Sequence, residues 1–122
     1  AKELKLPSSL HLFDGTVKTI VFNTIQHQDQ GQVLHYKISN DKSFIAQIME
    51  ALYQLKIQSV LIEGGAKLLQ SFIDENYWDE ARVITNRDLR ISDGIRAPLL
   101  FNSRHVYTEN ILSDTIQYYK HL

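Results

Sequence analysis

The strongest constraint in this sequence is one continuous run, Ser59–Ile73, in which three local patterns follow one another without a gap. An apolar stretch of β type ends in a carboxylate, Glu63, the pair Gly64-Gly65 follows at once, and an amphipathic helix is predicted over residues 66–76. Glycines let a ligand approach the main chain closely, and the free amides of a helix N-terminus attract anions. The run therefore predicts a strand, a turn and a helix whose junction is a candidate site for a phosphate or another anion.

Length and composition exclude several classes of protein. The 122 residues are 43% hydrophobic, which is enough for a single core, so we expect one domain or a piece of one. The net charge of −1 argues against a basic nucleic-acid-binding surface. The absence of cysteine removes disulfides, thiolate catalysis and cysteine zinc sites. No apolar run reaches the roughly 18 residues of a membrane span. We therefore expect a cytoplasmic protein with neither a nucleic-acid nor a membrane partner.

Apolar periodicity and turn residues divide the chain into alternating strands and helices. β-branched, aromatic or alternating stretches predict strands over residues 17–24, 32–39, 59–63 and 81–85. Apolar steps of three and four residues predict helices over residues 42–55, capped by Asn40 or Asp41, and over 66–76. Residues 1–15 indicate a connection running over a core, and residues 25–30 indicate a polar loop. Strands joined by helices imply right-handed parallel crossovers.

The last third of the chain has a different pattern. Residues 87–98 are polar, contain the turn Asp93-Gly94 and predict a surface loop. Two β-type runs, 105–109 and 115–121, are separated by residues 110–114 and predict an antiparallel hairpin. The predicted fold class is therefore α/β, a mostly parallel sheet flanked by helices with a C-terminal antiparallel hairpin.

The residues around the Glu-Gly-Gly turn leave alternatives open. The two glycines also suit a tight strand-to-helix turn with no ligand. Because Glu63 would repel an anion, it suits a hydroxyl or amino group of a ligand, and it equally suits capping of the following helix. Lys67 lies one turn into that helix, where it would reach a phosphate or remain solvated. Asn23 and Thr24 end the 17–24 strand at the sheet edge where ligands bind in open α/β folds.

Other chemistry is not indicated by the sequence. The histidines at 11, 27, 35, 105 and 121 are scattered without metal-ligand spacing, so we expect no metal. No arrangement of a nucleophile with a histidine and an acid is recognisable. The chain by itself indicates one nucleotide-compatible edge and no acid–base machinery.

The Glu-Gly-Gly run supports a family resemblance. Val60–Phe72, followed by Trp78–Val83 with its Asp-Glu pair opening a strand, resembles the reductase domain of the bacterial bifunctional riboflavin biosynthesis protein RibD. Supporting similarity extends to Lys2–Pro7, Thr19–Thr24 and Asp114–Tyr119, so nearly the whole chain is covered. The resemblance implies a dihydrofolate-reductase-like fold and an oxidoreductase that uses NADPH. Its substrate would be a small-molecule phosphoribosylaminopyrimidine, 5-amino-6-(5-phosphoribosylamino)uracil, which is reduced to the ribitylamino product.

The resemblance also assigns roles to residues of this chain. Glu63 would contact the substrate near the reacting sugar. The turn and first part of the helix would line the NADPH pyrophosphate, and the end of an adjacent strand would touch the cofactor. The implied cofactor-binding residues are Asn23, Thr24, Gly64, Gly65, Ala66, Lys67, Leu68, Leu69, Gln70 and Ser71. Hydride chemistry belongs to the cofactor, so the missing acid–base constellation is no objection.

The chain departs from the family pattern at its beginning. Neither the upstream reductase strands nor a deaminase domain precedes Ala1, so residues 1–122 are expected to be the C-terminal portion of an incomplete reductase domain that is inactive by itself. We expect a homodimer formed through a sheet edge or the C-terminal hairpin. The alternative is a module without catalysis, either a nucleotide- or anion-binding domain or a self-assembling one.

Overall fold

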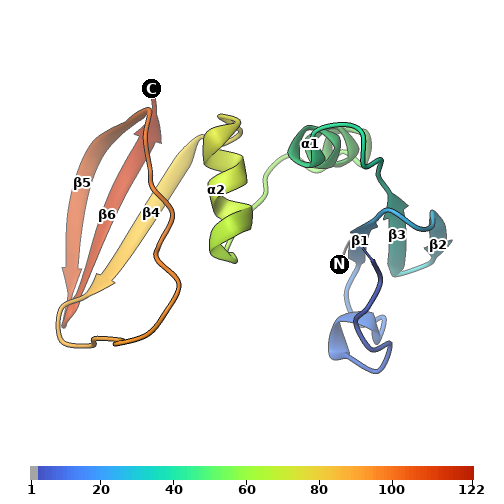
Figure 1. Ribbon diagram of the computed structural model, residues 1–122, viewed down its shortest axis with the longest axis horizontal. Coiled ribbons are helices and arrows are strands. Elements are labelled where there is room, and N and C mark those ends of the chain that lie inside the picture. The colour runs from blue at the N-terminus through green and yellow to red at the C-terminus, as the bar shows by residue number, and fades with distance from the viewer. Residues whose placement is uncertain (1–2) are drawn as a thin grey trace. The chain divides into compact units, whose positions relative to one another are not determined.

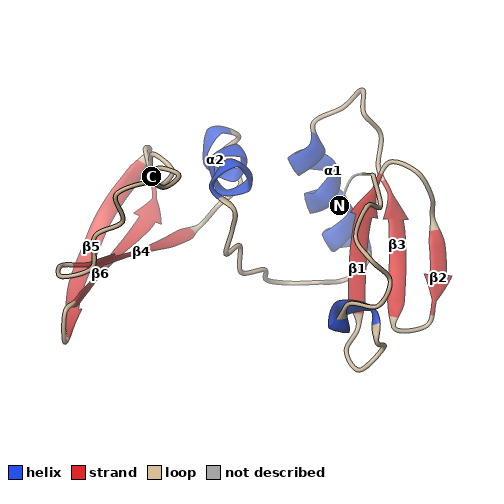
Figure 2. Cartoon of the chain, turned by 60° about the horizontal axis from the view of Figure 1, so that its bottom comes forward, coloured by secondary structure: helices blue, strands red, loops and turns tan. Residues whose placement is uncertain are grey.

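A computed structural model describes residues 3–122 of the protein, which divide into two compact units with a boundary between Val60 and Leu61. Each unit contains a three-stranded sheet and one α-helix (Figures 1 and 2).

The first unit is a small sheet with a helix packed on it. Its elements are η1 (His11–Phe13), β1 (Thr19–Asn23), β2 (Gln28–Gln30), β3 (Val33–Lys37) and α1 (Phe44–Gln54). The sheet order is β1-β3-β2, in which β1 runs parallel to β3 and β2 runs antiparallel to it. The core is apolar and comes from both layers: Val21, Val33, Leu34, Ile38, Ile45, Ile48, Ala51 and Leu52 are buried. Four of these lie on one stripe of α1, as the three- and four-residue spacing predicts.

The second unit is an antiparallel sheet with one helix. Its elements are α2 (Ala66–Asp74), β4 (Glu80–Asn86), β5 (Ser103–Ile111) and β6 (Asp114–His121), and the sheet order is β4-β6-β5. Phe72 and Ile73 of α2 are buried. The Gln70 side chain joins α2 to the loop after β4, because Gln70 Nε2 donates to the Leu99 carbonyl at 3.2 Å and the Leu99 amide donates to Gln70 Oε1 at 2.8 Å.

Most predicted elements are confirmed. β1, β3, α2 and β4 lie within or next to their predicted ranges, and the loop over 87–98 is free of helix and strand. The predicted hairpin is formed by β5 and β6, with longer strands and a tighter turn at Leu112-Ser113. Leu112 has a φ of 53°, a left-handed conformation that closes this short turn.

The strand predicted over residues 59–63 was wrong. These residues form no strand, and the boundary between the two units falls inside the run. A strand requires a neighbour that pairs with its amides and carbonyls. No strand within residues 3–122 pairs with this run, and Leu61 is 82% exposed. Apolar composition alone does not supply that neighbour.

Three further details also differ from prediction. The sheet was predicted to be mostly parallel, but β1–β3 is the one parallel pair among the described strands, and β4 pairs antiparallel with β6. The polar loop at 25–30 contains the short strand β2, whose residues are exposed and carry no apolar signal. Helix α1 is capped by Ser43, whose Oγ accepts from the Ala46 amide at 3.1 Å, instead of by Asn40 or Asp41.

Candidate functional site

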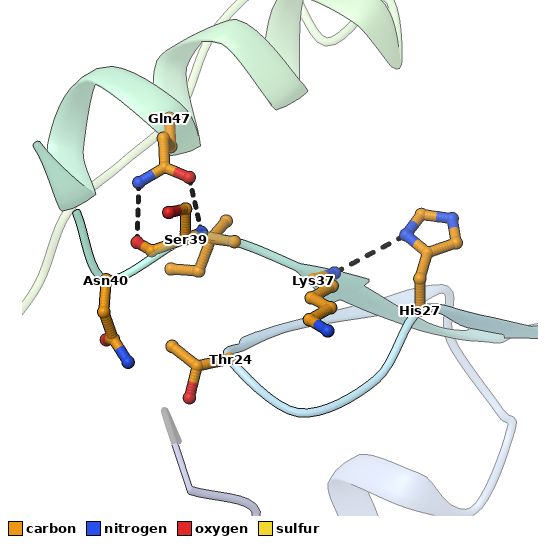
Figure 3. A pocket seen from close by; sticks show the side chains of 7 residues that line it. Thr24, His27, Lys37, Ser39, Asn40 and Gln47 are labelled. Carbon is orange, nitrogen blue, oxygen red and sulfur yellow. Dashed lines mark hydrogen bonds between the residues drawn. The ribbon is translucent and has the colours of Figure 1, made fainter. Parts of the chain in front are cut away.

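A pocket of about 600 Å³ lies in the first unit, at the carboxyl end of the parallel strands β1 and β3. It is lined by Thr24, His27, Lys37, Ile38, Ser39, Asn40 and Gln47. Figure 3 shows the side chains of Thr24, Lys37 and Asn40 pointing to the same side of the pocket. Ligands of open α/β sheets bind at this edge, so the position agrees with the sequence prediction for the end of β1.

The parallel pairing of β1 and β3 delivers the pocket residues. Asn23 at the end of β1 lies opposite Lys37 at the end of β3, and the Ile38 amide donates to the Asn23 carbonyl at 2.7 Å. The segments that follow β1 and β3 both leave the sheet after this contact. Thr24 is the first residue after β1, and Ile38 and Ser39 are the first two residues after β3; all three line the pocket at this edge.

Asn23 directly precedes the pocket residue Thr24 and is 0% exposed. Its Oδ1 accepts from the amides of Ile25 at 2.9 Å and Gln26 at 2.8 Å, and its Nδ2 donates to the Val21 carbonyl at 3.1 Å. The side chain is therefore occupied with backbone groups and fixes the turn that follows β1. The structure gives Asn23 a positioning role, while Thr24 lies on the pocket lining.

Gln47 of α1 fixes the other wall. Its Oε1 accepts from the Ser39 amide at 2.6 Å, and its Nε2 donates to the Ser39 carbonyl at 2.9 Å. The same Nε2 lies 3.3 Å from the carbonyls of Lys42 and Ser43. The Gln47 side chain thus holds the connection between β3 and α1 in place through both its oxygen and its nitrogen.

The electrostatics of the pocket favour an anion. None of its lining residues carries a carboxylate, whereas Lys37 brings an ammonium group that makes no ion pair with any residue in the described range. The Lys37 amide donates to His27 Nδ1 at 3.5 Å, so in the neutral imidazole the proton lies on Nε2. A pocket whose lining combines an ammonium group with hydroxyl groups and has no carboxylate is a chemistry that binds phosphate.

The Glu-Gly-Gly turn belongs to the second unit, directly before α2. Gly64 has a φ of 156°, which favours glycine, and the peptide bond between Gly64 and Gly65 is cis. A Cβ built on either glycine would find no atom within 4 Å, so the turn is open on its outer side. Gly65 is the N-cap of α2 and supplies no side-chain cap, so the first-turn amides lack a side-chain acceptor.

The structure separates the predicted residues of this turn into two groups. Glu63 is exposed and does not cap α2, which removes the alternative that it serves as a helix cap. Lys67 is exposed in the first turn, beside the amides of Ala66 and Leu68. Further along, Leu69 is half-buried, Gln70 is bonded to the Leu99 main chain, and Ser71 Oγ donates to the Lys67 carbonyl at 2.9 Å. The available donors are thus those of the first turn.

Comparison with known proteins decides the family. The family model described as the RibD C-terminal domain matches residues 1–86. The chain belongs to the RibD C-terminal domain family. No curated protein matches it. Among solved structures, RibD from Acinetobacter baumannii (form 2) matches with a TM-score of 0.71 and 19% sequence identity, over 98% of this chain and 35% of that chain. This likeness shows the fold, which is α/β of the dihydrofolate-reductase type.

The match to the RibD C-terminal domain family agrees with the resemblance seen in the sequence. The predicted resemblance to a RibD reductase domain is confirmed, and the matched span includes β1, β3, the Glu-Gly-Gly turn and β4. The chain spans about a third of the solved RibD chain.

Within residues 3–122 there is no group of three or more metal-ligating side chains, and no described helix has the length and apolarity to cross a membrane.

Sequence reasoning missed most of the pocket in this RibD-family chain. His27, Lys37, Ser39, Asn40 and Gln47 were not predicted as site residues. One signal was available, because the 32–39 strand also ends in polar residues, as the 17–24 strand does in Asn23 and Thr24. Two parallel strands that end in polar residues place those residues at one edge. Gln47 gave no such signal, since it is one of several polar residues on α1.

Proposed function

We propose that this RibD-family chain takes part in an NADPH-dependent reduction in riboflavin biosynthesis. The substrate we assign is 5-amino-6-(5-phosphoribosylamino)uracil, whose ribosyl ring is opened to a ribitylamino group. Family membership supports the reductase class. The observation that carries the nucleotide assignment is the pocket at the ends of β1 and β3, which presents Lys37 and several neutral donors without a carboxylate.

The residues present fit the phosphates of a nicotinamide dinucleotide. In the first unit, Lys37, Thr24 and Ser39 are the groups that would hold a phosphate. In the second unit, taken by itself, the open Gly64-Gly65 turn and the first-turn amides of α2 are groups that suit a phosphate. When bound, NADPH supplies the hydride, and the chain supplies binding and orientation. Lys67 adds a positive charge next to those amides.

Glu63 is assigned to the substrate instead of the cofactor. Its carboxylate precedes the turn, is exposed, and makes no ion pair with any described residue. A carboxylate would repel a neighbouring phosphate, but it accepts hydrogen bonds from hydroxyl and amino groups. The sugar and the pyrimidine of the proposed substrate both offer such donors.

The test is binding of NADP⁺ to the 122-residue chain by isothermal titration calorimetry. Lys37→Met removes a charge-assisted contact of about 1.5–3 kcal/mol, so Kd is expected to rise roughly 10- to 100-fold. Lys18→Met is the matched control, because Lys18 is exposed and lies before the opposite end of β1. Parallel titrations with NAD⁺ show whether Lys37 reads the 2′-phosphate, since only NADP⁺ carries it.

A second pair of variants tests the turn. Gly65→Val places a branched side chain where the pyrophosphate would lie, and Gly94→Val makes the same change in the exposed loop after β4. We expect NADP⁺ binding to be lost in the first variant and retained in the second. Absence of NADP⁺ binding by the unmodified chain, or binding that neither Lys37→Met nor Gly65→Val weakens, would contradict the proposal.

A further inference from the structure

The chain contains two Asp-Gly pairs, Asp14-Gly15 and Asp93-Gly94, to which the proposed reductase function gives no role. An Asp-Gly pair is well suited to an internal rearrangement, because glycine has no Cβ that shields its amide nitrogen from the preceding carboxyl group. The structure holds the two pairs in different ways, so their reactivities are expected to differ.

The rearrangement is a condensation within the chain, followed by hydrolysis. The glycine nitrogen attacks Cγ of the neutral aspartic acid, the N–Cγ bond forms, and the carboxyl hydroxyl leaves with the amide proton as water. Water then adds to one of the two carbonyl carbons of the five-membered ring. Breaking the N–Cγ bond restores aspartate, whereas breaking the original peptide bond leaves isoaspartate, in which the main chain runs through Cβ and Cγ. The atoms balance without an oxidant, a reductant or a co-reactant other than water.

Closing the ring requires a particular backbone torsion. Tetrahedral geometry at Cα places Cβ and the residue's own nitrogen about 120° apart around the Cα–C bond, so the next nitrogen eclipses Cβ when ψ is about −120°. Asp14 ends η1 with a φ of −75° and a ψ of −6°. The Gly15 nitrogen is therefore turned away from the Asp14 side chain.

The Asp14 carboxylate is also held by hydrogen bonds. Its Oδ1 accepts from the Thr16 hydroxyl at 2.7 Å and from the Thr16 amide at 2.9 Å, and its Oδ2 lies 3.1 Å from His11 Nδ1. The bond from the Thr16 hydroxyl, followed by those from the Thr16 amide and His11, lowers the pKa of Asp14. The neutral carboxyl group, which is the form that reacts, is therefore depleted at this position.

The second Asp-Gly pair has none of these restraints. Asp93 and Gly94 are exposed, and Ile95 beside them is 90% exposed. Among the described residues, no hydrogen bond or ion pair reaches residues 90–98. A Cβ built on Gly94 would meet nothing nearer than Ile91 Cγ2 at 3.5 Å, so its main chain is open to approach. A segment with so few contacts turns readily to the ψ that ring closure requires.

The contacts that do hold this loop lie at its two ends. Figure 1 shows the loop running from the end of β4 to the start of β5. At the first end, Asn86 Oδ1 accepts from the amides of Asp88 and Leu89 at 2.9 and 2.7 Å. At the other end, the Leu99 main chain is bonded to the Gln70 side chain. The extra methylene that isoaspartate adds to the main chain is therefore taken up between these anchors, away from the sheet.

We propose that Asp93 is a site of spontaneous isoaspartate formation in the folded protein and that the fold protects Asp14 from the same modification. The contrast follows from the free loop around Asp93 and from the fixed backbone and bonded carboxylate of Asp14. The proposal does not depend on the reductase assignment.

The test is ageing of the full 122-residue chain at neutral pH and body temperature in heavy-oxygen water. Each passage through the ring adds one solvent oxygen, and isoaspartate peptides separate from aspartate peptides on reversed-phase chromatography. Trypsin places the two pairs in different peptides, Leu6–Lys18 and Ile91–Arg96, so one digest reports both. The label and isoaspartate in Ile91–Arg96 are expected to exceed those in Leu6–Lys18 by about tenfold or more, the factor for releasing two or more hydrogen bonds.

Two further arms separate the fold from the local sequence. In guanidinium chloride sufficient to unfold the chain, labelling of Leu6–Lys18 should rise to approach that of Ile91–Arg96, because the backbone and the carboxylate of Asp14 are then free. Gly94→Val places a branched side chain beside the attacking nitrogen and should suppress labelling of that peptide, while Leu6–Lys18 is unchanged.

Three results would overturn the proposal. The first is equal labelling of the two peptides in the folded chain, and the second is the absence of label and isoaspartate from Ile91–Arg96. The third is a difference that persists undiminished in the unfolded chain, because the fold would then have no part in protecting Asp14.

Discussion

Replacing Asn23 by alanine is expected to destabilise the first unit by about 3 kcal/mol. The side chain is 0% exposed and makes three well-formed hydrogen bonds, to the Val21 carbonyl and from the amides of Ile25 and Gln26. Each such bond contributes about 1 kcal/mol net, and the loss of a buried partner leaves polar groups unsatisfied. The turn that Asn23 fixes carries Thr24, so the substitution is also expected to loosen the wall of the pocket.

Urea unfolding followed by far-ultraviolet circular dichroism measures this change. With an m value of about 1.5 kcal/mol/M, a loss of about 3 kcal/mol lowers the midpoint by roughly 2 M. Asn40→Ala is the control, because Asn40 is exposed on the same pocket and should change stability by less than about 0.5 kcal/mol. Hydrogen exchange should show faster exchange at the amides of Ile25 and Gln26. A loss below about 1 kcal/mol, or unchanged protection at both amides, would refute the reasoning.

Three further predictions concern other parts of the chain. Hydrogen bonds to Tyr107 and Glu109 raise the pKa of Tyr118 to about 12. The ionisation of this phenol is measured as the difference in absorbance near 295 nm between the unmodified chain and Tyr118→Phe. This difference should titrate near pH 12. Because the folded-state pKa is the higher one, this contribution to stability is present below pH 10 and is lost as the pH rises through 12; titration near pH 10 would contradict it. Ser43→Ala removes the side-chain cap of α1 and should lower the free energy of unfolding, measured with urea, by about 1 kcal/mol. An unchanged free energy of unfolding would show that the cap is not formed. Gln70→Ala removes both bonds to the loop after β4, so hydrogen exchange at the Leu99 amide should accelerate, and unchanged exchange would show that the loop is held by other contacts.

Local chemistry explains which elements the sequence predicted correctly. β1 is rich in β-branched and aromatic residues, the segment that forms β3 alternates, and α1 places Ile45, Ile48 and Leu52 on one stripe. Each pattern is decided by residues a few positions apart, so it can be recognised without knowledge of distant segments. The cap of α1 was misplaced by two or three residues, because Asn40, Asp41 and Ser43 all have side chains able to cap, and only the path of the chain selects among them.

The candidate site was predictable only in part. Thr24 and the Glu-Gly-Gly turn were predicted as candidates because a strand end and two glycines before a helix are local signals, and Thr24 lines the pocket. Lys37 and Gln47 became site residues through the parallel pairing of β1 with β3 and the packing of α1, which are contacts between separate segments. Asn23 shows the reverse case, since its place at a strand end predicted a ligand contact, whereas burial directs its side chain to the backbone.

The sequence by itself determined where helices and strands can form, the resemblance to the RibD family and the chemical character of the Glu-Gly-Gly turn. Tertiary structure alone decided which strands pair, because the backbone groups of a strand are satisfied only by a neighbour whose identity lies elsewhere in the chain. The run Ser59–Glu63 illustrates the limit, since its composition favours a strand and yet no described strand pairs with it. The pocket has the same origin, because it gathers residues that are distant in sequence and the register between β1 and β3 placed them together.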